Sequence, residues 1–121
     1  NQIANKLCEQ TRNMHAAGFF HHDLKLKNIL LRQDDAGLHL IWIDCPRATL
    51  AWRKRRSAII DLGRLGRLGS HYLSVKQQLR WLHNYLGDKA SPTEVKKLFL
   101  DVKNYLDRRN PPHPYELPGN E

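Results

Sequence analysis

The fold is expected to form around one polar loop, His21-His22-Asp23-Leu24-Lys25-Leu26-Lys27-Asn28. Residues 19–27 follow neither the period of a helix nor that of a strand, so they are predicted to be irregular. A helix is predicted before the loop, because Ile3, Leu7 and Met14 recur at helical spacing. It should run through Ala17 and end at Gly18.

Two short strands follow the loop. Ile29-Leu30-Leu31 begins the first strand, and residues 38–43, rich in Ile, Leu and Trp, form the second. Asp34-Asp35-Ala36-Gly37 between them has the composition of a turn. The pattern predicts a β-hairpin over residues 28–44, which would return Asp44 to the loop.

The remaining chain is predicted to be a helical body over residues 53–109. Its first helix is weakened and ended by glycines, its second has a capping box made by Ser74 and Gln77, and its third starts at Ser91-Pro92-Thr93-Glu94. The proline-rich residues 111–121 should form an irregular tail. The predicted fold class is α+β, mostly helical, with one short hairpin beside the loop.

Composition narrows the functional class. The chain has 121 residues, enough for one domain, and its net charge of +8 favours anionic partners such as nucleotides, phosphorylated sugars or a membrane surface. Its apolar runs are too short to span a bilayer. Cys8 and Cys45 are expected to be reduced thiols in the cytoplasm. The first residues lack an initiating Met and a signal peptide, so a partial, cytoplasmic chain is expected.

The loop holds the groups that phosphoryl transfer requires. Transfer from ATP needs a carboxylate at the acceptor hydroxyl, oxygen ligands for Mg²⁺, and a cation near the developing charge. The loop matches the pattern H-x-D-L-K-x-x-N, with His22 where Arg is usual. Carboxylate and amide oxygens favour magnesium over zinc.

The sequence resembles the lipopolysaccharide core kinase family, the Kdo and heptose kinases, which have a protein-kinase-like fold. The resemblance lies in four segments in the family's order: Met14-His15-x-x-Gly18, His21-His22-Asp23-Leu24-Lys25-x-x-Asn28-Ile29-Leu30, Ile43-Asp44-Cys45-Pro46-Arg47 and Asp61-Leu62-Gly63-Arg64-Leu65. It implies an ATP-dependent kinase that phosphorylates a sugar hydroxyl of the lipopolysaccharide inner core.

The resemblance also implies a role for individual residues. Asp23 would be the catalytic base, and Lys25 would approach the transferred phosphate. Asn28 and Asp44 would hold the Mg²⁺ of the nucleotide. His21 would be structural, and Asp61 would be a buried helix carboxylate that braces the catalytic loop, residues 19–28.

The sequence departs from protein kinases in two ways. Asp44-Cys45-Pro46 stands in place of Asp-Phe-Gly, and the short link from there to Asp61 has no Ala-Pro-Glu motif. These features favour a small or glycolipid acceptor over a peptide. There is also no glycine-rich loop, so residues 1–110 are expected to form a C-terminal lobe whose N-terminal lobe is absent. The isolated chain should then be inactive or very weak.

A basic run follows the hairpin, and it has two interpretations. Arg47, Arg53, Arg55 and Arg56 could be the solvated start of a helix. They could instead clamp a phosphorylated acceptor or an anionic lipid, which would place the protein at the inner face of the inner membrane. No RNA or DNA motif accompanies them, so no nucleic acid partner is expected.

The sequence also leaves two alternative functions open. The chain could phosphorylate another small hydroxyl compound, such as an aminoglycoside or choline. It could also be a pseudokinase or a basic binding module, although a scaffold has no need to keep Asp23, Asn28 and Asp44 together. Zinc at His15, His21 and His22 is disfavoured because no Cys lies at ligand spacing.

Overall fold

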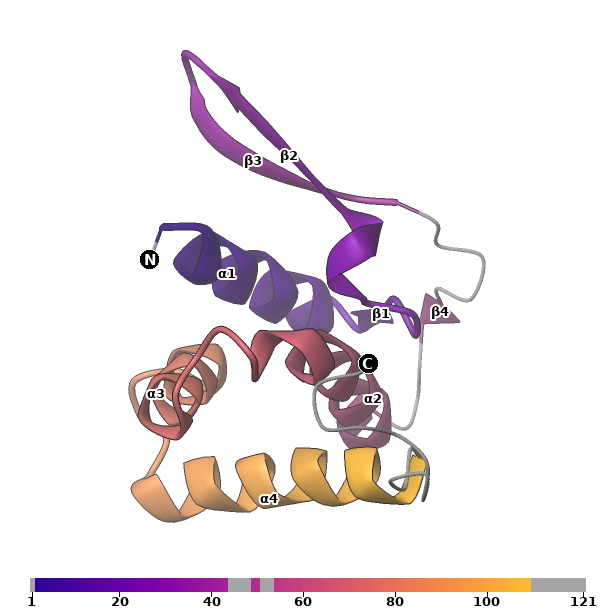
Figure 1. The fold of residues 1–121 in the computed structure, drawn as a ribbon, viewed down its shortest axis with the longest axis vertical. Helices are drawn as coiled ribbons and strands as arrows, with labels where there is room; N and C mark the ends of the chain where they lie inside the picture. Colours follow the sequence, from indigo (N-terminus) through magenta and orange to yellow (C-terminus); the bar gives the residue numbers. More distant parts are fainter. Residues whose placement is uncertain (1, 44–48, 51–53, 110–121) are drawn as a thin grey trace.

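A computed structural model describes residues 2–43, 49–50 and 54–109. Within these residues the chain forms four α-helices, one 3₁₀ turn and two small antiparallel sheets of two strands each. The helices pack into one body, and the longer strand pair extends away from it (Figure 1). This arrangement confirms a mostly helical α+β fold.

The first helix, α1 (Gln2–Ala16), ends one residue before the predicted Ala17. Gly18 has φ of 82°, a left-handed conformation that glycine adopts without strain, and its N–H donates to the His15 carbonyl at 2.9 Å. One face of α1 lies against a later helix. The Trp81 indole donates to the Ala4 carbonyl at 2.9 Å, and the Cys8 thiol donates to the Trp81 carbonyl at 3.4 Å.

The prediction that residues 19–27 are wholly irregular was wrong at both ends. Strand β1 (Phe19–Phe20) pairs with β4 (Thr49–Leu50), and a 3₁₀ turn, η1, covers Leu26–Asn28. The single hairpin predicted for the fold is therefore accompanied by a second strand pair. A two-residue strand cannot show a period of two, so its sequence carries no signal.

The predicted hairpin is confirmed as β2 (Ile29–Asp34) and β3 (Gly37–Trp42). Its register runs from Ile29 opposite Trp42 to Asp34 opposite Gly37. A side chain of α1 anchors the hairpin to the helical body. The Gln10 amide donates to the Leu40 carbonyl at 2.9 Å and accepts from the Leu40 N–H at 3.3 Å.

Three helices complete the body: α2 (Lys54–Gly69), α3 (Val75–Leu86) and α4 (Pro92–Arg109). The capping box between Ser74 and Gln77 is present in both directions, as predicted. The Ser91 hydroxyl accepts from the Glu94 N–H at 3.2 Å, which confirms the predicted start of α4. The buried apolar residues of these helices include Leu62, Leu65, Leu82, Val95 and Leu98.

Helix α2 connects this core to the polar loop. It packs against α4 on one side and contacts β1 and η1 on the other. A side chain on α2 can therefore be rigidly held by the core and still reach the loop. Among the described helices, none has the length and apolar character required to cross a membrane.

Candidate active site

The backbone of the loop is held by one buried carboxylate. Asp61, on α2, has no solvent exposure. Its Oδ2 accepts from the His21 N–H at 3.0 Å, and its Oδ1 accepts from the His22 N–H at 2.7 Å. His22 has φ of 67°, which is uncommon for a residue other than glycine. The two bonds to Asp61 hold the chain in this turn.

Two further side chains, His15 and Tyr85, extend the hydrogen bonds of Asp61 to α1 and α3. His15 Nε2 lies 2.7 Å from Asp61 Oδ2, and His15 Nδ1 lies 2.6 Å from the Tyr85 hydroxyl. The His15 ring also stacks on buried Phe20, with 4.6 Å between ring centroids. Burial, followed by the negative charge of Asp61, raises the pKa of Tyr85 well above its usual range. Helices α1, α2 and α3 thus meet at one polar cluster beneath the loop.

His21 links the loop to the end of the hairpin. It is fully buried, and its Nδ1 accepts from the Asp23 N–H at 3.1 Å. That bond leaves the proton on Nε2, which donates to the Ile43 carbonyl at 3.1 Å. The Ile43 N–H also donates to the Asn28 carbonyl at 2.9 Å. The hairpin therefore returns to the loop at Ile43, the residue before Asp44.

Asp23 and Asn28 are brought together within the loop. The Asn28 side-chain nitrogen donates to the Asp23 carbonyl at 2.9 Å and lies 3.4 Å from Asp23 Oδ2. These contacts fix the orientation of the amide, with its oxygen directed away from Asp23. The Asn28 side chain is buried, while the Asp23 side chain is 22% exposed and accessible to a small ligand.

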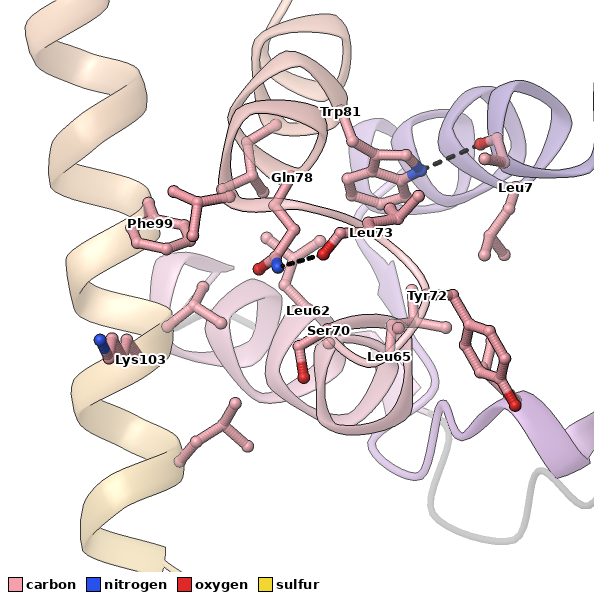
Figure 2. A pocket seen from close by; sticks show the side chains of 18 of the residues that line it. Leu7, Leu62, Leu65, Ser70, Tyr72, Leu73, Gln78, Trp81, Phe99 and Lys103 are labelled. Carbon is pink, nitrogen blue, oxygen red and sulfur yellow. Dashed lines mark hydrogen bonds between the residues drawn. The ribbon is translucent and has the colours of Figure 1, made fainter. Parts of the chain in front are cut away.

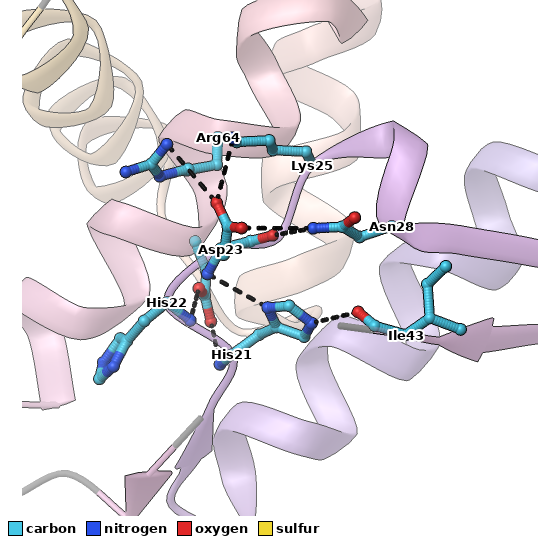
Figure 3. Close-up of polar contacts among 8 residues, drawn as sticks. His21, His22, Asp23, Lys25, Asn28, Ile43 and Arg64 are labelled. Carbon is cyan, nitrogen blue, oxygen red and sulfur yellow. Dashed lines mark hydrogen bonds and ion pairs between the residues drawn. The ribbon is translucent and has the colours of Figure 1, made fainter. Parts of the chain in front are cut away.

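Two cations lie beside the same oxygen of Asp23. Lys25 Nζ is 3.4 Å from Asp23 Oδ1, and an Arg64 terminal nitrogen is 3.6 Å from it (Figure 3). Lys25 comes from the loop itself, and Arg64 comes from α2. A carboxylate, an amide and two cations therefore converge at one point on the surface. Such a group can orient a hydroxyl and stabilise a phosphate close to it.

The other predicted site residues have different outcomes. Asp44, Arg47 and Arg53 lie outside the described residues. Arg55 forms an ion pair with Asp101 on α4 at 2.6 Å, and that hydrogen bond lowers the pKa of Asp101. Arg56 is exposed on α2. The possible role of Arg55 and Arg56 in holding an acceptor stays a prediction.

Sequence reasoning missed three residues of this site. His15 and Arg64 lie in the segments that resemble the kinase family, but no role in the kinase site was predicted for them. Tyr85 lies outside those segments. One signal was available for Arg64, because it follows Asp61 by three residues and so occupies the same face of α2. The contact between His15 and Tyr85 spans 70 residues of sequence, and no local pattern predicts it.

A separate apolar cavity of about 440 Å³ lies between the helices. Its walls include Leu7, Leu62, Leu73, Trp81 and Phe99, and its polar residues are few (Figure 2). Neither Asp23 nor Asn28 lines it. The cavity is thus distinct from the polar site on the loop.

Comparison with known proteins gives one match. The model of the family described as "Lipopolysaccharide kinase (Kdo/WaaP) family" matches residues 1–85, which include the loop, the hairpin and Asp61. Neither the curated proteins nor the solved structures contain a significant match. The matched segment is well over half of the chain and contains the whole polar site. This chain therefore belongs to the lipopolysaccharide kinase (Kdo/WaaP) family.

Proposed function

We propose that the chain is the catalytic C-terminal lobe of an ATP-dependent kinase for a sugar hydroxyl of the lipopolysaccharide inner core. The observation that carries this proposal is the geometry of Asp23. It sits partly exposed in a loop whose backbone is fixed by Asp61, with Asn28 and Lys25 in contact. Family membership supports the same reaction class.

Asp23 would act on the acceptor hydroxyl. Its carboxylate accepts a hydrogen bond from the hydroxyl and so aligns the oxygen with the γ-phosphorus. As the new P–O bond forms and the bond to the β-phosphate oxygen breaks, the hydroxyl proton passes to Asp23. A sugar hydroxyl is hardly ionised at neutral pH, so orientation and late proton acceptance are the main contributions. Lys25, at the exposed side of the site, would balance charge on the transferred phosphoryl group.

The residues present fit a magnesium nucleotide. The amide nitrogen of Asn28 is committed to Asp23, which leaves the amide oxygen to serve as a metal ligand. Asp44 would supply a carboxylate oxygen, and hard oxygens are the ligands that Mg²⁺ prefers. When bound, the ion neutralises charge on the β- and γ-phosphates.

An apolar surface next to the site supports a nucleotide cleft completed by a second lobe. Leu30 and Ile41 face each other across the hairpin, and they are 50% and 38% exposed. Leu30 is two residues from Asn28. An exposed apolar pair beside a polar site is typical of a surface that binds a partner. We expect the N-terminal lobe of the kinase and the nucleotide to cover it.

The test is phosphate transfer by the full-length protein. With Mg²⁺ and labelled ATP, we expect label to enter lipopolysaccharide whose inner core has been dephosphorylated. Asp23→Asn should lower turnover about 10²- to 10⁴-fold, the usual contribution of a general base. Asp35→Asn, in the exposed turn of the hairpin, is the matched control and should leave turnover unchanged. Asp44→Ala should abolish transfer without unfolding the protein.

Two results would contradict the proposal. A folded Asp23→Asn or Asp44→Ala protein with near-normal turnover would show that the loop is not catalytic. Faster transfer to an aminoglycoside or to choline than to lipopolysaccharide would show that the acceptor class is wrong. Thermal unfolding of each variant separates lost chemistry from lost structure.

A further inference from the structure

We propose that Arg64 is a positioning residue, which holds the Asp23 carboxylate in place while phosphate is transferred. This inference rests on the proposed kinase function. Among the described residues, the ion-pair partner of Arg64 is the side chain of Asp23, whereas Asp61 bonds to the loop backbone. The two residues of α2 would therefore divide the task, with Asp61 fixing the backbone and Arg64 fixing the carboxylate.

The position of Arg64 on α2 supports this division. Residues three apart on a helix lie on the same face, so Asp61 and Arg64 point toward the same loop. Asp61 is anchored by bonds to His21 and His22, and Arg64 reaches Oδ1 of Asp23 at 3.6 Å. Because α2 also packs against the core through Leu62 and Leu65, the base of Arg64 is held more rigidly than a loop residue would be.

Burial distinguishes Arg64 from an ordinary surface arginine. Its side chain is 21% exposed, and its Nε has no accessible surface and no hydrogen-bond partner among the described residues. A buried donor without a partner is costly, so its position calls for an explanation. Contacts of catalytic groups are often long before substrate binds and shorten in the reacting complex. If the contact with Asp23 shortened in the same way, the guanidinium nitrogens of Arg64 would come within hydrogen-bonding distance of the carboxylate.

The second cation at Asp23 explains why Arg64 is needed. Lys25 lies at the same carboxylate oxygen, but its side chain is 36% exposed and comes from the loop. In the proposed reaction Lys25 turns toward the transferred phosphoryl group and so leaves Asp23. Arg64 extends from α2 and not from the loop, and in this proposal it stays with the carboxylate. With Oδ1 held by Arg64, the carboxylate keeps one orientation toward the acceptor hydroxyl.

The first experiment compares Arg64→Gln with Arg67→Gln in the full-length protein. Arg67 is an exposed arginine one turn further along α2, so it is a matched control. Arg64→Gln should lower kcat about 10- to 100-fold, which is the loss expected from a misplaced catalytic group. The KM for ATP and the KM for the acceptor should both stay within about twofold of wild type. Arg67→Gln should behave as wild type. Arg64→Lys keeps the positive charge but loses the planar guanidinium group. Its kcat should lie between that of wild type and that of Arg64→Gln.

The second experiment tests whether Arg64 acts through Asp23. In an Asp23→Asn background, Arg64→Gln should cause no further loss of kcat. Urea unfolding of the same four proteins gives a readout that does not depend on activity. If the two side chains interact, the double variant loses that interaction only once. Its unfolding equilibrium constant should then be at least about threefold lower than the value calculated from independent single effects.

Each outcome decides a separate point. Additive effects on kcat or on the unfolding equilibrium would overturn the role of Arg64, as would an Arg64→Gln enzyme with wild-type kcat. A rise in KM for ATP with unchanged kcat would show that Arg64 binds the nucleotide instead. Wild-type protein without Mg²⁺-dependent transfer would contradict the proposed kinase function, and the unfolding cycle would still decide the contact between Arg64 and Asp23.

Discussion

A buried carboxylate is tolerated only where hydrogen-bond donors compensate for its lost hydration. Asp61 meets this condition with three contacts, to the N–H groups of His21 and His22 and to the ring of His15. The two N–H groups can only donate. An amide at position 61 would therefore direct an NH₂ group toward at least one of these donors.

We expect Asp61→Asn to destabilise the protein by about 3 kcal/mol, because it leaves a buried donor unpaired. Urea unfolding followed by circular dichroism measures the change. Asp88→Asn, at an exposed position between α3 and α4, is the control and should stay within about 0.5 kcal/mol of wild type. A cost below about 1 kcal/mol for Asp61→Asn would mean that the loop does not depend on this carboxylate.

Cys8 gives a prediction about alkaline pH. Burial raises the pKa of its thiol from the ordinary 9.0 to about 11. The unfolded chain therefore loses this proton at lower pH than the folded chain. The protonated thiol therefore contributes to the stability of the folded state. This contribution is fully present below pH 9 and is lost as pH rises from 9 to 11.

Between pH 8 and pH 11, the free energy of unfolding of wild type should fall by about 2 to 3 kcal/mol relative to that of Cys8→Ala. Cys45 and Tyr85 are present in both proteins, so their titration largely cancels in the difference. Urea unfolding at several pH values provides the measurement. A difference that stays constant across this range would show that the Cys8 thiol is not shielded from water.

Some residues of the site could be found from sequence alone, and others could not. Asp23 and Asn28 lie five residues apart in one motif, so local spacing was enough to bring them together. Arg64 reaches Asp23 only because α2 folds back across the loop, a contact between distant segments. Tyr85 joins the cluster from yet another helix. Spacing places Arg64 on the face of α2 that also carries Asp61, but it does not identify Asp23 as the partner of Arg64.

At the scale of elements, α2 contains glycines that should weaken a helix, yet it continues past two of them. At Gly63 the reason is close packing, because a Cβ placed there would lie 2.8 Å from the ring of Tyr105 on α4. At Gly66 a Cβ would meet nothing within 4 Å. The two glycines therefore differ in what they contribute, although the sequence makes them look alike.

The same substitution at these two positions should have opposite effects. Gly63→Ala should destabilise the protein by about 1 to 3 kcal/mol, because the methyl group overpacks the contact between α2 and α4. Gly66→Ala should stabilise it by about 0.5 to 1 kcal/mol through better helix propensity. Thermal unfolding of both variants provides the comparison. Equal effects of the two substitutions would contradict the packing at Gly63.

The elements differed in how well their sequence predicted them. The hairpin and the caps of α3 and α4 are encoded by local turn and capping chemistry, and all were predicted. Strands β1 and β4 were missed, since two residues carry no period and the pairing depends on a distant segment. The end of α2 at Gly69 followed from sequence, while its persistence through Gly63 depended on α4.

At the scale of the whole molecule, the net charge of +8 predicts electrostatic attraction to anionic surfaces. Each basic residue near an anionic bilayer contributes about 1 kcal/mol. We expect the protein to sediment with phosphatidylglycerol vesicles at low salt. Raising the salt to about 1 M, where the screening length is about 3 Å, should release it.

Vesicles of phosphatidylcholine alone are the control for this experiment, and they should retain little protein. Equal sedimentation with both vesicle types, or binding that is unaffected by salt, would contradict an electrostatic contact with the membrane. The first of these results would instead indicate insertion of apolar side chains.

The bonds between α1 and α3 also matter while the chain is being made. Ala4, Cys8 and His15 bond to partners 70 to 77 residues later in the sequence. At the usual 5 to 20 residues per second, a ribosome takes about 4 to 15 s to add that many. Throughout this time the face of α1 that packs against α3 lacks its native partner. We therefore expect the nascent chain to need protection by a ribosome-associated chaperone, for a time that is set by the speed of translation.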